Sequence, residues 1–204
     1  MRIVRAADYR RMPWKNGGGA TTEVAIAPAN ATLDDFDWRI SMAHVATPGP
    51  FSRFPDIDRT LAVLHGHGIR LTVADTPAVT LTQTSPPHVF PGDADAAATL
   101  VDGPIDDLNV MSRRDRYRHR MTRHHVTEAI AVPLDAEAII TMPRGGGIEC
   151  IINGAVTQIG DGESGAIGRP EYERMNAREM TIRPVRDAES TTGIDLYLIG
   201  FWRR

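Results

Sequence analysis

Hydrophobic and polar residues alternate over short runs along most of this chain, which is the pattern of half-buried β-strands. In residues 36–43 the apolar positions lie on one face and the polar positions on the other: Phe36, Trp38, Ile40 and Met42 against Asp37, Arg39 and Ser41. The run from Thr60 to Leu64 is apolar on both faces, as expected of a strand that is covered on both sides. The loop Pro48–Pro50 excludes a helix between these two strands.

Similar strands follow along the chain, separated by glycine and proline turns at intervals of about 8 to 12 residues. We expect strands at 3–4, 21–27, 70–74, 78–82, 97–101 and 108–111, a rigid loop at 85–93, and further strands at 125–132, 138–142, 148–152, 155–159, 164–167, 179–184 and 194–201. Both halves show an apolar strand, a glycine turn, a second strand and a Gly/Asp turn, which indicates a duplication. The pattern predicts an all-β sandwich or barrel fold.

Three blocks of the first 115 residues resemble one known family. The longest, from Phe36 to Leu71, reads FDWRISMAHVATPGPFSRFPDIDRTLAVLHGHGIRL, and the others are Pro13–Gly19 (PWKNGGG) and Leu100–Arg114. Together they are similar to the HutD/Ves family, which are metal-free double-cupin proteins linked to histidine utilisation. The resemblance implies two cupin-like (double-stranded β-helix, RmlC-like) barrels in one chain, the first formed by residues 1–112 and the second by residues 113–204.

Composition limits the classes of function. The formal net charge of −3 argues against a general role in binding nucleic acid. The arginine-rich segment 113–125 could contact phosphates, but it is more typical of a solvated or salt-bridged outer strand face, since no aromatic platform accompanies it. A single cysteine, Cys150, excludes an internal disulfide, and no apolar run reaches the length of a membrane span or a signal peptide. We therefore expect a cytoplasmic protein that binds neither nucleic acid nor membrane.

The 23 basic residues include a single lysine, Lys15, within the glycine-rich loop. Since arginine is used at every other basic position, Lys15 and its neighbour Asn16 suggest a site that needs a compact ammonium group; a structural salt bridge is the alternative. A phosphate-binding loop is disfavoured because no Walker spacing and no helix follow the glycines.

A metal site or a nucleophilic site is less well supported. His65 and His67 have the spacing of a cupin metal pair, because residues i and i+2 share a strand face, but the further glutamate and histidine ligands are missing. We expect no metal and no other cofactor, with His65 and His67 as the ligands if a metal is bound. Cys150 lies in an apolar run and is expected to be a small core residue.

The remaining candidates are polar or aromatic residues in strands and loops that the resemblance places in the first barrel. Asn109 and Arg113 share a strand face with Asp107 and Met111. We predict a ligand-binding site formed by Lys15, Asn16, Arg39, Ser41, Phe51, Arg59, Asn109 and Arg113. Converging cations in a partly desolvated barrel favour a small anion, and arginine binds carboxylates bidentately. The alternative is a structural ion-pair network.

The predicted function is non-enzymatic binding of a small anionic metabolite. The resemblance implies urocanate, N-formylglutamate or formate-like anions as ligands and a modulating role in histidine utilisation. Two alternatives remain: a cofactor-free cupin enzyme with Lys15 or His65 as a base, and a metal-dependent oxygenase. Exposed barrel faces also allow a homodimer.

Overall fold

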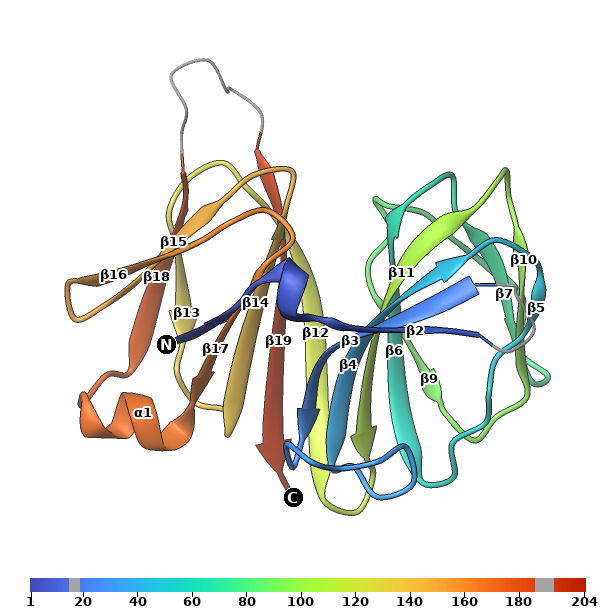
Figure 1. Cartoon of the computed structure of the whole chain (residues 1–204), viewed down its shortest axis with the longest axis horizontal. Helices are drawn as coiled ribbons and strands as arrows, with labels where there is room; N and C mark the ends of the chain where they lie inside the picture. The colour runs from blue at the N-terminus through green and yellow to red at the C-terminus, as the bar shows by residue number, and fades with distance from the viewer. Residues whose placement is uncertain (15–18, 186–192) are drawn as a thin grey trace. The chain divides into compact units, whose positions relative to one another are not determined.

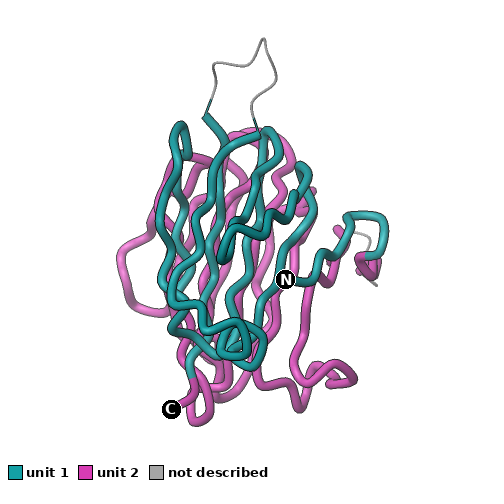
Figure 2. The backbone as a smooth tube through the Cα atoms, turned by 90° about the vertical axis from the view of Figure 1, so that its left-hand side faces the viewer, with its two compact units in different colours: residues 1–8, 120–202 teal, residues 9–119, 203–204 magenta. Residues whose placement is uncertain are grey.

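The computed structural model describes residues 1–14, 19–185 and 193–204. The chain forms two compact units (Figure 2). Unit 1 comprises Met1–Asp8 and Arg120–Trp202, and unit 2 comprises Tyr9–His119 and Arg203–Arg204. The sequence-based division after residue 112 differs from these bounds, because β-strand pairing joins the first residues of the chain to the second half.

Unit 2 contains two antiparallel sheets (Figure 1). The six-stranded sheet has the order β2 (Arg10–Pro13), β3 (Gly19–Ala27), β4 (Trp38–Val45), β11 (Ile105–Arg113), β6 (Ile57–His65) and β9 (His88–Pro91). The four-stranded sheet has the order β5 (Gly49–Pro50), β10 (Ala96–Leu100), β7 (Ile69–Val73) and β8 (Val79–Leu81). Apolar side chains of both sheets pack together and form the interior of a barrel, among them Leu61, Val63, Leu71 and Ala98.

Register places the polar residues of β4, β6 and β11 in neighbouring rows. Asn109 of β11 lies opposite Ser41 of β4 and Leu61 of β6. Met111, two residues on, lies opposite both Arg39 and Arg59. Since residues two apart on a strand share a face and Leu61 belongs to the apolar interior, these polar side chains face the inside of the barrel.

Unit 1 repeats the two-sheet plan. Its five-stranded sheet has the order β1 (Arg2–Val4), β17 (Ser164–Gly168), β14 (Ala138–Arg144), β19 (Ile194–Arg203) and β12 (Tyr117–Val126). Its four-stranded sheet has the order β13 (Ile130–Pro133), β18 (Glu179–Pro184), β15 (Ile148–Ile152) and β16 (Ala155–Ile159). Two short helices, η1 (Ala6–Asp8) and α1 (Arg169–Arg174), complete the described elements, and neither is long and apolar enough to cross a membrane.

The prediction of an all-β chain with two cupin-like barrels is confirmed. Two local predictions are wrong, and one element was not predicted. Residues 88–91 form the edge strand β9 instead of a rigid loop; an edge strand tolerates Pro91 because it does not need every backbone donor. Residues 125–132 are divided between β12 and β13, and the helix α1 was not expected. Pro170 in its first turn and the bond from Gly168 N–H to the Glu171 carboxylate favour that helix.

Candidate functional site

Arg39 of β4 is paired directly with a carboxylate of the neighbouring strand β3. Arg39 Nε donates to Glu23 Oε2 at 2.8 Å, and Arg39 Nη1 donates to Ser41 Oγ at 3.3 Å. The register of β3 shifts between Glu23 and Ala25, so that Glu23 lies opposite Ser41 while Ile26 lies opposite Arg39. This irregularity brings the Glu23 carboxylate to the interior face, where it neutralises Arg39.

A second arginine, Arg59 of β6, has a neutral hydrogen-bond partner. Its Nε and Nη2 both donate to Asn109 Oδ1, at 2.8 and 2.5 Å. Asn109 Nδ2 in turn donates to Asp107 Oδ1. The side chains form a chain from guanidinium through amide to carboxyl, and all three residues are at most 5% exposed.

Aromatic rings surround the Arg59 guanidinium. Its Cζ lies 4.5 Å from the centroid of Phe51 and 5.4 Å from that of Phe90, and the two rings meet edge to face. His88 stacks on Phe90 with the ring centroids 6.2 Å apart. Such rings stabilise a cation through their faces while they exclude water.

Not all N–H groups of Arg59 have an acceptor among the described residues. A guanidinium carries five N–H groups, and Arg59 uses Nε and Nη2 on one amide oxygen. Across the described ranges its Nη1 donates to no residue. Arg59 therefore keeps donors at a position that is 5% exposed, whereas Arg39 meets a carboxylate directly.

Burial dominates the ionisation of this group of side chains. It lowers the pKa of Arg59 to about 10, with Asp107 opposing and Arg39 adding to the fall. Burial also raises the pKa of Asp107 to about 7, against the opposing charge of Arg59. Arg59 is therefore cationic at neutral pH, whereas Asp107 changes its protonation state near neutral pH.

The structure brings together five predicted site residues: Arg39, Ser41, Phe51, Arg59 and Asn109. Arg113 is elsewhere, because its Nε and Nη2 donate to the carbonyls of Phe36 and Asp34 and hold that loop. Lys15 and Asn16 lie outside the described residues.

Sequence reasoning missed Glu23, Asp107 and Phe90. The sequence shows that Asp107 shares a strand face with Asn109, but the predicted site did not include the negative charge of Asp107. Glu23 needed the register shift, and Phe90 needed the pairing with Arg59 across β6 and β9. The predicted surplus of positive charge is therefore wrong for Arg39, which Glu23 neutralises.

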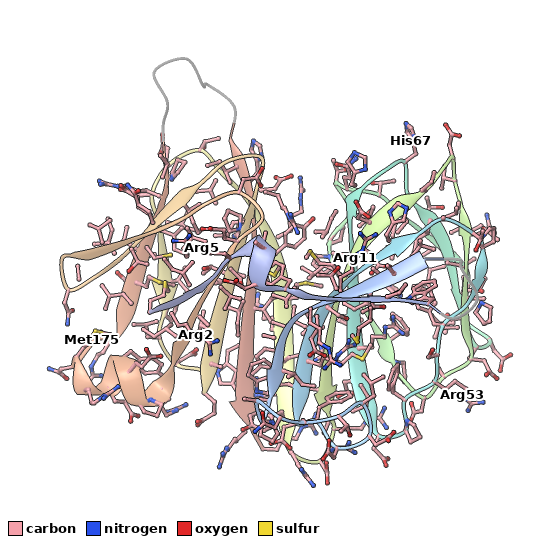
Figure 3. The ribbon with its side chains drawn as sticks, in the orientation of Figure 1. Arg2, Arg5, Arg11, Arg53, His67 and Met175 are labelled. Carbon is pink, nitrogen blue, oxygen red and sulfur yellow. The ribbon has the colours of Figure 1, made fainter. Side chains whose placement is uncertain are left out.

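His65 and His67 do not share a strand face. His65 ends β6, and the turn that follows has positive φ at Gly66 (89°) and Gly68 (115°). His67 projects from the end of the barrel (Figure 3), where its Nδ1 lies 3.1 Å from the Asp102 carbonyl oxygen. Among the described residues no group of three or more His, Cys, Asp or Glu side chains is arranged to hold a metal ion.

Two other predicted groups have local explanations. Arg114 bridges Asp58 and Asp93, and Arg116 bridges Asp37, so this part of the arginine-rich segment forms salt bridges. Cys150 is buried in unit 1, and burial raises the pKa of its thiol to about 11. A protonated, enclosed thiol is a poor nucleophile.

Comparison with known proteins agrees with this architecture. The family model described as HutD matches residues 6–177. This chain belongs to the HutD family. Protein Ves of Citrobacter koseri is 35% identical over 158 residues, covering 76% of this chain and 75% of Ves. An uncharacterised 21.2 kDa protein from the hutC 3′ region of Pseudomonas putida is 39% identical over 121 residues, which span 59% of this chain and 63% of that relative. Membership of the HutD family relates the chain to histidine utilisation.

Solved structures extend the similarity to both units. A conserved protein of unknown function from Pseudomonas aeruginosa PAO1 has a TM-score of 0.84 at 28% identity, covering 98% of both chains. HutD from Pseudomonas fluorescens SBW25 has a TM-score of 0.77 at 28% identity, covering 100% of this chain and 98% of that one. Oxalate decarboxylase of Bacillus subtilis, at 7% identity and a TM-score of 0.64, shares the fold alone.

Proposed function

We propose that this HutD-family protein binds a small carboxylate metabolite at Arg59, inside the barrel of unit 2, and thereby modulates histidine utilisation without catalysing a reaction. The observation that supports the proposal is the state of Arg59. It is 5% exposed, and its hydrogen bonds go to the neutral amide of Asn109. A buried cation without a directly bonded anion is costly, and an entering carboxylate removes that cost.

The surroundings fit a small, partly apolar anion. Each charge-assisted hydrogen bond contributes about 1.5–3 kcal/mol, and the rings of Phe51 and Phe90 add apolar contact. Two such bonds together with ring contact are sufficient for micromolar affinity, about −8 kcal/mol. Ser41 and Asn109 are polar groups that could read an amide, formyl or imidazole group on the same ligand.

Urocanate and N-formylglutamate are the candidate ligands that the family role suggests, and formate is the smallest probe of the carboxylate site. The solved Pseudomonas fluorescens HutD is described for a formate condition, which supports this choice of probe. Each of the three molecules carries at least one carboxylate, so they test a common anchor while they differ in the rest of their structure.

The test is calorimetric titration of the purified protein with formate, N-formylglutamate and urocanate. We expect Arg59→Gln to lose binding of all three at least a hundredfold. The matched control is Arg53→Gln, whose side chain is 62% exposed and bridges Asp95 on the outside of the same unit (Figure 3). Equal affinity in wild type and Arg59→Gln would show that Arg59 is only a structural cation.

The same samples test the non-enzymatic part of the proposal. After treatment with a chelator, incubation with urocanate or N-formylglutamate should leave both compounds intact. Turnover under these conditions would favour the cofactor-free enzyme. Turnover that requires added metal would favour the oxygenase with His65 and His67.

A further inference from the structure

The chain of contacts from Arg59 through Asn109 to Asp107 places an ionisable carboxyl behind the proposed anion site. Asn109 accepts from Arg59 with its oxygen and donates to Asp107 with its nitrogen, so the amide orientation is fixed from both sides. Asp107 is 1% exposed, and the nearby backbone N–H of Ala43 acts against the rise of its pKa. The carboxyl is thus held close to Arg59 without touching solvent.

Charge balance in this interior depends on Asp107. Arg39 and Glu23 neutralise each other through their direct bond. With Asp107 ionised, Arg59 is also balanced, and an entering carboxylate leaves one uncompensated buried negative charge. With Asp107 protonated, the entering carboxylate balances Arg59 instead. A buried net charge is strongly unfavourable, so the second state is preferred.

Groups on every neighbouring strand support this accounting. The charge of Arg59 on β6 acts on Asp107, and Asp106 on β11 itself adds a negative charge that favours the protonated form. Arg39 on β4 acts on Arg59 and is paired with Glu23 on β3. The nearby part of β9 contributes Phe90 and the ring of His88. The interior positions of β7 and β10 are apolar, as at Leu71 and Ala98.

We propose that Asp107 couples anion binding at Arg59 to the uptake of one proton, so that the barrel takes up a carboxylate and a proton together. This inference rests on the proposed function, because it requires an anion at Arg59. The proton comes from solvent and forms an O–H bond on Asp107, and no other bond is made or broken. The carbonyl oxygen of the neutral acid still accepts from Asn109.

The ionisation of the unliganded protein places this coupling at physiological pH. Burial raises the pKa of Asp107 to about 7, and the charge of Arg59 restrains that rise. An anion on Arg59 cancels the restraint and adds repulsion, so binding raises the pKa of Asp107 further. Linkage then requires the affinity to fall as pH rises above about 7, by up to tenfold per pH unit.

The decisive experiment is titration with formate in two buffers of different ionisation enthalpy, such as phosphate and Tris. Formate is suitable because its own carboxyl stays ionised between about pH 6 and 9. We expect the heats at about pH 8 to differ by the amount that corresponds to nearly one proton taken up per formate. The dissociation constant should rise about tenfold between pH 7.5 and 8.5.

Two variants separate Asp107 from its neighbour. Asp107→Asn removes the titrating group but keeps the shape, so its formate affinity should be independent of pH and of buffer. The matched control Asp106→Asn lies on the same strand but is 46% exposed and paired with His44, and it should keep both dependences. If Asp107→Asn does not fold, the buffer dependence of the wild-type heats decides the question.

Each outcome discriminates between the two proposals. If the heat of formate binding to the wild type does not depend on the buffer and the affinity does not depend on pH, the proton coupling is refuted. The anion site is then unaffected. A pH dependence that persists in Asp107→Asn would assign the proton elsewhere and also overturn the proton coupling. The absence of formate binding at every pH would refute the anion site, and the coupling with it.

Discussion

The two units share a plan of two antiparallel sheets but differ in what the barrels enclose. The buried interior of unit 1 is an apolar cluster that includes Ile148, Ile182 and Leu196. Within the described part of unit 1, the buried polar groups include the hydroxyl groups of Thr141, Ser164 and Tyr172, and none of the buried side chains is charged. Unit 2 buries Arg39, Arg59 and Asp107 together with several neutral polar groups.

The difference teaches how similar barrels divide stability and function. Burial of apolar side chains stabilises the fold, whereas each buried charge lowers stability unless it is well paired. Buried charges with shifted pKa values mark a candidate functional site, because such groups cluster where a protein binds or reacts. Unit 2 is therefore the unit in which we place ligand binding, and unit 1 serves as the reference.

The largest effect is expected from breaking the direct ion pair of unit 2. Arg39→Met leaves the Glu23 carboxylate, 16% exposed, without its partner. We expect the free energy of unfolding to fall by about 3–5 kcal/mol, measured by urea denaturation. The double variant Glu23→Gln/Arg39→Met removes the orphaned charge and should recover much of the loss. Equal stability of the single and double variants would contradict the pairing.

A cavity in unit 1 should cost nearly as much stability but leave binding intact. Leu196 is fully buried in the apolar cluster. Leu196→Ala is expected to lower the free energy of unfolding by about 2–5 kcal/mol, as loss of buried methyl groups and an unfilled cavity do. Titration well below the melting temperature should give wild-type formate affinity. A loss of affinity would show that unit 1 contributes to the site.

Asp107 should give unit 2 a pH-dependent instability. Burial raises its folded-state pKa from 3.8 to about 7, so between these values the folded protein holds a proton that the unfolded chain releases. Stability therefore falls as pH rises from about 4 to 7. Relative to wild type, Asp107→Asn should become more stable across this range, as read from unfolding at several pH values. A constant difference between the two proteins would contradict the shift.

His119 should act with the opposite sign. Its Nε2 and Nδ1 lie 2.8 and 2.7 Å from the hydroxyl oxygens of Thr60 and Ser112, and burial lowers its pKa to about 4. The neutral ring therefore contributes stability fully above about pH 6.5, and this contribution is lost as pH falls toward 4. His119→Gln should be less sensitive to acid than wild type. The same acid sensitivity in both would rule out this assignment.

The smallest effect concerns the thiol of unit 1. Since Cys150 is buried and its pKa is raised to about 11, a thiol reagent should label the native protein only as fast as it opens. Labelling should accelerate in Leu196→Ala, because the cavity lowers the free energy of opening. Rapid labelling of native wild type would show that this interior is accessible.

Much of the fold could be predicted because alternation is a local property. Arg39 and Ile40 lie in strand β4, as the alternation predicts, and the apolar run 60–64 lies within β6. The irregular positions could not be predicted in the same way. The register shift after Glu23 and the pairing of β9 with β6 depend on partners distant in sequence, and no local pattern reports them.

The site was predicted in part for the same reason. Residue type and strand face are enough to select Arg39, Arg59 and Asn109 as inward-facing polar residues. They do not reveal which cation is already neutralised, because that depends on the opposite strand. Arg113 shows the limit most clearly: it lies on the strand of Asn109, but its side chain binds the loop carbonyls of Asp34 and Phe36.

The pairing of β1 with β17 has a consequence for biosynthesis. Met1–Asp8 are translated before unit 2, yet they belong to the unit whose other strands are translated after it. Most of unit 2 can fold while the chain is still growing, but β1 must wait, unpaired, for its neighbour. A nascent chain that stops after His119 therefore carries β1 without β17, the strand with which it pairs in the complete fold.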